Sequence, residues 1–104
     1  MTREELEQKL TKFIDNFCVE LNNKLDIHII IEAKILVSFY CFDIHAFKLL
    51  EMNKEQRQKL RDEILIFIKD ENLNNYITQV EVYSNFIRFY LDTRIVNKLL
   101  KKVG

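Results

Sequence analysis

The sequence predicts an α+β two-layer sandwich, in which helices pack on a four-stranded antiparallel sheet. Two observations lead to this class. Apolar stripes with a helical period predict long helices near residues 3–24 and 53–71. Stretches rich in β-branched and aromatic residues predict two hairpins, at residues 27–42 and 78–91. With two shorter helices added, the predicted order is α-ββ-α-α-ββ-α.

The first helix is expected from about Arg3 to Lys24. Thr2 and Glu5 form a T-x-x-E capping box, which satisfies free backbone N–H groups at a helix start. Apolar side chains then repeat at helical spacing and define one core-facing stripe: Leu6, Leu10, Phe13, Phe17 and Leu21.

Residues 27–42 are expected to form two strands, IHIII and ILVSFYCF, joined around Glu32-Ala33-Lys34. That junction lacks Gly, Asn and Asp, so a bulged or wider connection also fits, and periodicity alone leaves a helix open. Neither face of these strands is polar, which is typical of strands covered on both sides.

Asp43 is expected to cap a short helix, IHAFKLLEM, and Asn53 with Gln56 forms the N-x-x-Q box that opens the second long helix. Leu65 and Ile66 lie off the core stripe of that helix, so we expect it to be covered on two sides. Its core stripe is Leu60, Ile64, Phe67 and Ile68. Asp92 is expected to cap a final helix.

The 78–91 hairpin has the best-defined geometry in the chain. A two-residue turn at Ser84-Asn85, where Asn tolerates a positive φ, pairs Tyr83 with Phe86 and Glu81 with Arg88. Any one-residue slip would move the apolar set to the other face. The predicted inner face is Val80, Val82, Ile87, Phe89 and Leu91. The predicted outer face is Glu81, Tyr83, Phe86, Arg88 and Tyr90.

Three triplets recur along the chain, QKL, LNN and KLL, at offsets of 50, 52 and 50 residues. They suggest an internal αββα duplication of residues 2–52 and 53–103, with chance recurrence of common residues as the alternative. The length of 104 residues indicates a single domain, 1–104. The alternation of helix and hairpin resembles the order of elements in LAGLIDADG endonucleases, secretion chaperones and roadblock-type dimerisation domains. The acidic, glycine-containing helix motif of the endonucleases is missing, since the first helix reads FIDNFCVELNN.

Composition excludes several classes of function. A single Gly and no Pro exclude a glycine-rich phosphate loop, and a net charge of zero argues against a general nucleic-acid binder. No apolar run is long enough for a membrane span and the N-terminus is acidic, so we expect a cytoplasmic protein. Residues with AT-rich codons far outnumber those with GC-rich codons, which suggests an AT-rich genome.

No catalytic constellation or cofactor motif is recognisable, so an enzyme is the least supported class, although it stays open. His28 and His45 are 17 residues apart, and Cys18 and Cys41 form no CxxC pair. Paired ligands on tight turns, which structural zinc sites use, are missing. We therefore expect no metal and two buried free thiols.

The outer hairpin face is the main candidate for a site, and three interpretations compete for it. It is covered by another protein subunit, it is packed under the chain's own helices, or it stacks unpaired bases. The predicted protein interface comprises Leu65, Ile66, Tyr83, Phe86, Arg88 and Tyr90. A basic stripe at helical spacing either complements the helix dipole or binds phosphates or an acidic partner: Arg94, Lys98, Lys101 and Lys102.

These observations favour a small non-enzymatic protein that binds another protein, plausibly as a homodimer. An accessory protein of a phage or mobile element, such as an inhibitor of host defence, fits the size and codon bias. The alternative is a nucleic-acid-binding module that uses the 78–91 sheet face and the basic C-terminal helix.

Overall fold

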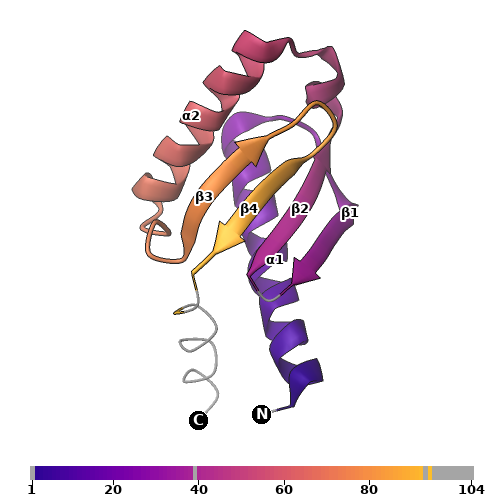
Figure 1. The fold of residues 1–104 in the computed structure, drawn as a ribbon, viewed down its shortest axis with the longest axis vertical. Helices are drawn as coiled ribbons and strands as arrows, with labels where there is room; N and C mark the ends of the chain where they lie inside the picture. Colours follow the sequence, from indigo (N-terminus) through magenta and orange to yellow (C-terminus); the bar gives the residue numbers. More distant parts are fainter. Residues whose placement is uncertain (1, 39, 93, 95–104) are drawn as a thin grey trace.

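The computed structural model describes residues 2–38, 40–92 and 94, and it shows an α+β fold with an antiparallel sheet (Figure 1). The sheet has four strands in the order β1-β2-β4-β3. The predicted α+β class with an antiparallel sheet is therefore confirmed, whereas the predicted order of elements, α-ββ-α-α-ββ-α, is not. The elements are α1 (Arg3–Leu25), β1 (Ile29–Ser38), β2 (Cys41–Ala46), the 3-10 helix η1 (Phe47–Glu51), α2 (Lys54–Asp70), β3 (Ile77–Val82) and β4 (Ile87–Leu91).

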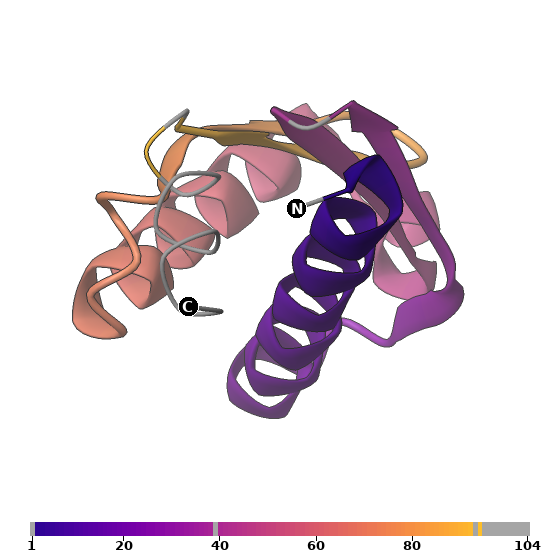
Figure 2. The same ribbon diagram turned by 90° about the horizontal axis from the view of Figure 1, so that it is seen from below.

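Both helices α1 and α2 lie on the same side of the sheet, so the core is the layer between them and the strands (Figure 2). Three aromatic rings form its centre. Phe42 of β2 and Phe89 of β4 stack with ring centroids 5.0 Å apart, and Phe17 of α1 meets Phe89 edge-on at 5.1 Å. Stacked and edge-to-face pairs are the favoured aromatic geometries, so this trio ties α1 to the two central strands.

Helix α1 begins and packs as the sequence predicts. The side chain of Thr2 accepts a hydrogen bond from the backbone N–H of Glu5, and the expected stripe supplies buried residues, including Leu10 and Leu21. The helix ends without a glycine. Asp26 adopts the left-handed conformation, with φ of 50°, and its N–H donates to the carbonyl of Asn22. Asp tolerates this conformation better than most residues, which lets a chain with almost no glycine end the helix.

The connection between the first two strands differs from the prediction. Glu32-Ala33-Lys34 is not a turn but lies inside β1, which continues to Ser38, and β2 begins at Cys41. The ladder is irregular around this segment: Ile30 pairs with His45 and Ile35 with Asp43, so β1 contributes more residues than β2 between these pairs. A bulge absorbs extra residues in one strand, which is the bulged option that the poor turn chemistry left open.

Asp43 is not a helix cap, contrary to the prediction. It lies in β2, where its neighbours across the sheet are Ile35 and Arg88. Strand β2 continues as far as Ala46, because backbone hydrogen bonds to strands on both of its sides stabilise it more than one local helical turn would. The predicted short helix is reduced to η1, which starts at Phe47. Residues 95–104, the predicted final helix, lie outside the described residues.

Helix α2 begins at the predicted capping box. The Asn53 side chain accepts from the Gln56 backbone N–H at 2.9 Å, and the Gln56 side chain accepts from the Asn53 N–H at 2.8 Å. The four predicted core residues of this helix are all buried. Leu65 packs partly against the core, whereas Ile66 is 60% exposed. The described residues therefore leave the second apolar side of α2 uncovered, where we expected cover.

The β3–β4 hairpin has the predicted register. Glu81 pairs with Arg88, and the Tyr83 N–H donates to the Phe86 carbonyl at 2.9 Å across the turn. The predicted positive φ at Asn85 is wrong, because the non-glycine residues with positive φ in the described chain are Asp26, His28 and Asn72. No helix among the described residues is long and apolar enough to cross a membrane.

Candidate binding surface

The side of the sheet that faces away from α1 and α2 is the candidate surface, and we call it the outer face (Figure 2). One row of residues crosses it from edge to edge: Ile35 pairs with Asp43, Asp43 with Arg88, and Arg88 with Glu81. Apolar residues stand at its β1 side, where Ile35 is 52% and Val37 is 51% exposed. Neither described helix covers this face, so the interpretation that the chain's own helices bury it finds no support in α1 or α2.

An ion pair between Arg88 and Asp43 occupies the centre of the outer face. Nε of Arg88 donates to Oδ1 of Asp43 at 2.7 Å, and Nη2 donates to Oδ2 at 2.9 Å. This bidentate geometry is the strongest form of the arginine–carboxylate contact. Its hydrogen bonds raise the pKa of the Arg88 guanidinium above its usual range. Asp43 thus largely neutralises the charge of Arg88 within the molecule. The sequence pattern assigned Asp43 a different role, that of a helix cap.

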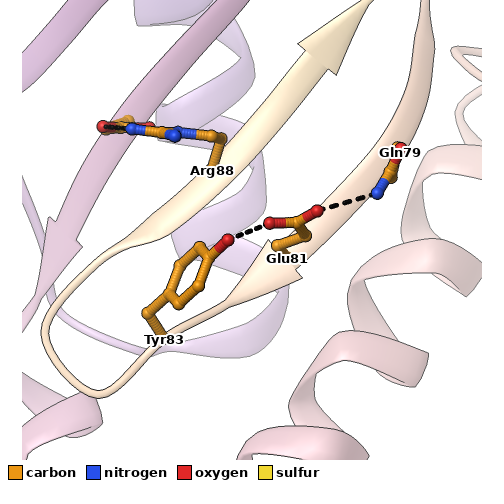
Figure 3. Close-up of polar contacts among 5 residues, drawn as sticks. Gln79, Glu81, Tyr83 and Arg88 are labelled. Carbon is orange, nitrogen blue, oxygen red and sulfur yellow. Dashed lines mark hydrogen bonds and ion pairs between the residues drawn. The ribbon is translucent and has the colours of Figure 1, made fainter.

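Glu81 therefore does not serve as the ion-pair partner that its position opposite Arg88 suggested. Its carboxylate accepts one hydrogen bond from the Tyr83 hydroxyl and another from the Gln79 side-chain amide, at 2.8 Å for the amide (Figure 3). The hydrogen bond to Glu81 raises the pKa of the Tyr83 phenol, because a nearby carboxylate opposes a second negative charge. Tyr83 thus stays a neutral donor.

Aromatic side chains cluster at the hairpin end of the outer face. The rings of Tyr83 and Phe86 stack with centroids 4.6 Å apart, and the Arg88 guanidinium lies 5.4 Å from the centre of the Phe86 ring. The His45 ring lies 6.4 Å from the same ring. We call Tyr83, Phe86, Arg88 and Tyr90 the aromatic patch. These contacts hold its side chains in place before any partner arrives.

The predicted interface residues do not all share one surface. Tyr83, Phe86, Arg88 and Tyr90 lie together on the outer face, with Tyr83 39% exposed. Leu65 and Ile66 belong to α2, which lies on the other side of the sheet (Figure 2). Sequence reasoning missed Ile35 and Val37, because the assumed turn at residues 32–34 gave the first hairpin the wrong register. The continuous apolar run Ile35-Leu36-Val37, which leaves neither face of the strand polar, is the signal that could have identified them.

The predicted basic stripe is mostly outside the described residues, since Lys98, Lys101 and Lys102 fall there. Arg94 is described, and its side chain forms two hydrogen bonds with the Asp92 carboxylate, at 3.1 and 2.8 Å. These bonds raise the pKa of the Arg94 guanidinium. Arg94 is thus already paired within the chain.

The cysteines and histidines do not come together as a site. Cys18 is buried in the core beneath the sheet, where desolvation raises the pKa of its thiol to about 12. Cys41 is only partly buried, contrary to the expectation of two buried thiols, and lies with His45 on the outer face in β2. His28 is exposed in the loop that follows α1. Among the described residues, no three His, Cys, Asp or Glu side chains are grouped closely enough to hold a metal ion.

A second surface feature lies where the β3–β4 turn meets the beginning of α2. There, Lys54, Arg57 and Arg61 line an open pocket of about 320 Å³. Sequence reasoning missed it, although basic residues at i, i+3 and i+7 are the signal of one helix face. Comparisons with known proteins found no matching family model, no similar curated protein and no similar solved structure.

Proposed function

We propose that this chain is a small non-enzymatic protein that binds another protein through the outer face of its sheet. The observation that carries the proposal is that α1 and α2 both pack on the inner side, while the outer face presents aromatic and aliphatic side chains. A sheet face with this composition gains free energy when a partner removes it from water, at roughly 25 cal/mol per Å² of apolar area.

The composition of the face supports a protein partner. Aromatic residues and Arg are enriched in protein interfaces and dominate their binding energy. Asp43 and Arg88 form a bidentate ion pair with each other, so a protein that covers them leaves neither charge buried without a counter-charge. The stack of Tyr83 and Phe86 is already ordered, which lowers the entropy lost on docking.

A second copy of the chain is the first partner to test. An isologous dimer would place the two aromatic patches against each other or against the exposed Ile35 and Val37. In the other form of the proposal, the partner is a different protein. A regulatory role in a phage or mobile element, such as inhibition of host defence, would act through such a partner.

Light scattering coupled to size exclusion tests the dimer directly. We expect wild type to be dimeric at micromolar concentration, Phe86→Glu to be monomeric, and Ile66→Glu on α2 to remain dimeric. If wild type is monomeric, affinity capture from the native host should recover one protein with wild type and Ile66→Glu but not with Phe86→Glu. A monomer that captures the same proteins in all three forms contradicts the proposal.

The nucleic-acid alternative is less favoured by this geometry. Arg88 is held by Asp43, and Glu81 adds a carboxylate to the same face. Stacked bases would place phosphates near these acidic groups without a free cation from Arg88 to balance them. Binding of single-stranded oligonucleotides that weakens on Phe86→Ala and with rising salt would reverse this preference.

We also propose the internal duplication that the recurring triplets suggest. It is supported by the strand order, in which β2 and β4 pair at the centre while β1 and β3 form the two edges. Each helix then precedes one hairpin, and the halves of the sheet correspond. Separate fragments of residues 1–52 and 53–104 that associate into the native sheet would support it.

A further inference from the structure

The pocket between α2 and the β3–β4 turn carries an excess of positive charge. Lys54, Arg57 and Arg61 follow one another at i, i+3 and i+7, which places them on one face of α2. Tyr83 and Ser84 form the opposite wall of this pocket. Among the described residues that line it, none is acidic.

We propose that this pocket binds the phosphate group of a small phosphorylated molecule. Tyr83 belongs to both this pocket and the aromatic patch, but the basic residues of the pocket lie on α2, and the inference does not rest on the docking of a protein on the outer face. Its ligand is defined by chemistry: a compact oxyanion of charge near −2, small enough for a cavity of about 320 Å³.

Two of the three cations are held in place by the backbone. Nη1 of Arg57 donates to the Met52 carbonyl at 2.9 Å, and Nε of Arg61 donates to the Val80 carbonyl at 2.8 Å. A guanidinium has five N–H donors in a rigid fork, so each arginine keeps several for a ligand. The terminal nitrogens of Arg61 remain as a pair, which suits bidentate contact with a phosphate. Both contacts are part-buried, so the arginines are ordered in advance.

Three cations elsewhere in the described chain lie in ion pairs with a carboxylate. Lys34 pairs with Asp15, Arg88 with Asp43 and Arg94 with Asp92. Within the described part of the chain, no ion pair includes Lys54, Arg57 or Arg61.

Three positive charges gathered without counter-charge repel one another and gain from an anion between them. Glu81, the acidic residue nearest to Tyr83 on β3, is held by Tyr83 and Gln79. The backbone N–H groups at the start of α2 are not part of the proposed phosphate site, since the Gln56 N–H already donates to the Asn53 side chain.

Inorganic pyrophosphate is the probe, added to the full ¹⁵N-labelled chain and followed by amide chemical shifts and by calorimetry. We expect saturable shifts at residues 54–61 and 83–85. Lys54→Gln and Arg57→Gln should each weaken binding about fivefold, through loss of a charge-assisted contact. Arg61→Lys should weaken it about threefold, because it keeps the charge and loses the fork.

Lys59→Gln is the matched control, because Lys59 is exposed on the same helix and does not line this pocket. Its affinity for pyrophosphate should stay within twofold of wild type, and the thermal melts of all variants establish that each is folded. Equal losses in Lys59→Gln and Lys54→Gln, or no saturable shift at millimolar pyrophosphate, overturn the proposal. Binding of a single-stranded oligonucleotide without any binding of pyrophosphate also overturns it, because the ligand would then be a phosphodiester chain.

Discussion

Arg88 of β4 and Asp43 of β2 join the two halves of the sheet through two parallel hydrogen bonds, although 45 residues separate them in sequence. Asp43 is 8% exposed, so its carboxylate depends on this partner. We expect Arg88→Ala to lower the melting temperature by at least about 5 °C, because a buried carboxylate without a partner is strongly destabilising. Thermal unfolding followed by circular dichroism measures the effect.

The double variant Arg88→Ala/Asp43→Ala is the control for this prediction. It removes the charge together with its partner, so it should melt at a higher temperature than Arg88→Ala alone. Equal melting temperatures for the single and double variants would show that the orphaned carboxylate is not the cause.

Neighbouring substitutions in the second hairpin should have opposite consequences. Ile87 is fully buried and Phe86 is half-buried on the other face, so Ile87→Glu should unfold the chain whereas Phe86→Glu should leave it folded. Circular dichroism reads folding and size exclusion reads association. If Phe86→Glu also unfolds the protein, the outer face belongs either to a second core layer or to an obligate dimer in which folding and association are one event.

Cys18 should make stability fall at alkaline pH. The pKa of its thiol is raised from 9.0 to about 12 by burial, so the folded state holds a proton that the unfolded state releases. The stabilisation is complete below about pH 9 and is lost as pH rises towards 12, by as much as about 4 kcal/mol. Denaturant titrations across this range should show a shallower decline for Cys18→Ala. An identical slope in both proteins would contradict the assignment.

The capping box of α2 should contribute about 1 kcal/mol. Asn53→Ala removes the acceptor for the Gln56 N–H, so the free energy of unfolding should fall by about that amount. Asn53→Asp is the control, because a carboxylate caps a helix equally well and should restore stability. Urea unfolding would separate the two outcomes, and equal destabilisation by both variants would remove the cap as the explanation.

The elements with strong local periodicity could be predicted from the sequence. Polar and apolar residues alternate at 80–82 and again at 87–89, on either side of the Ser84-Asn85 turn, and this pattern specifies the register of the second hairpin. The capping residues and core stripes of α1 and α2 are equally local. In contrast, residues 27–42 are apolar on both faces, so nothing in the pattern distinguishes a first strand that ends before residue 32 from one that continues to Ser38.

The candidate surface could be predicted only in part, because its geometry depends on long-range pairing. The aromatic patch followed from the hairpin register. The role of Asp43 did not, since an acidic residue after an apolar strand is more often a cap, and its partner Arg88 lies on a distant strand. The sequence groups Leu65 and Ile66 with the patch only because they are hydrophobic. Hydrophobicity does not show on which side of the sheet a residue lies.

The adjacency of β2 and β4 also has a kinetic consequence. Each edge strand can pair with its neighbour across a short turn. Pairing of β2 with β4, the central seam of the sheet, instead requires closing a loop of about 45 residues. Closing that loop costs conformational entropy before any stabilising contact forms. We therefore expect refolding to be limited by the meeting of two preformed hairpins. Phe42→Leu at the seam should slow refolding in stopped-flow experiments, whereas Asn85→Ala in the turn should change the rate little. The pairing of β2 with β4, which completes the sheet, is then also the step that nucleates folding of the whole chain.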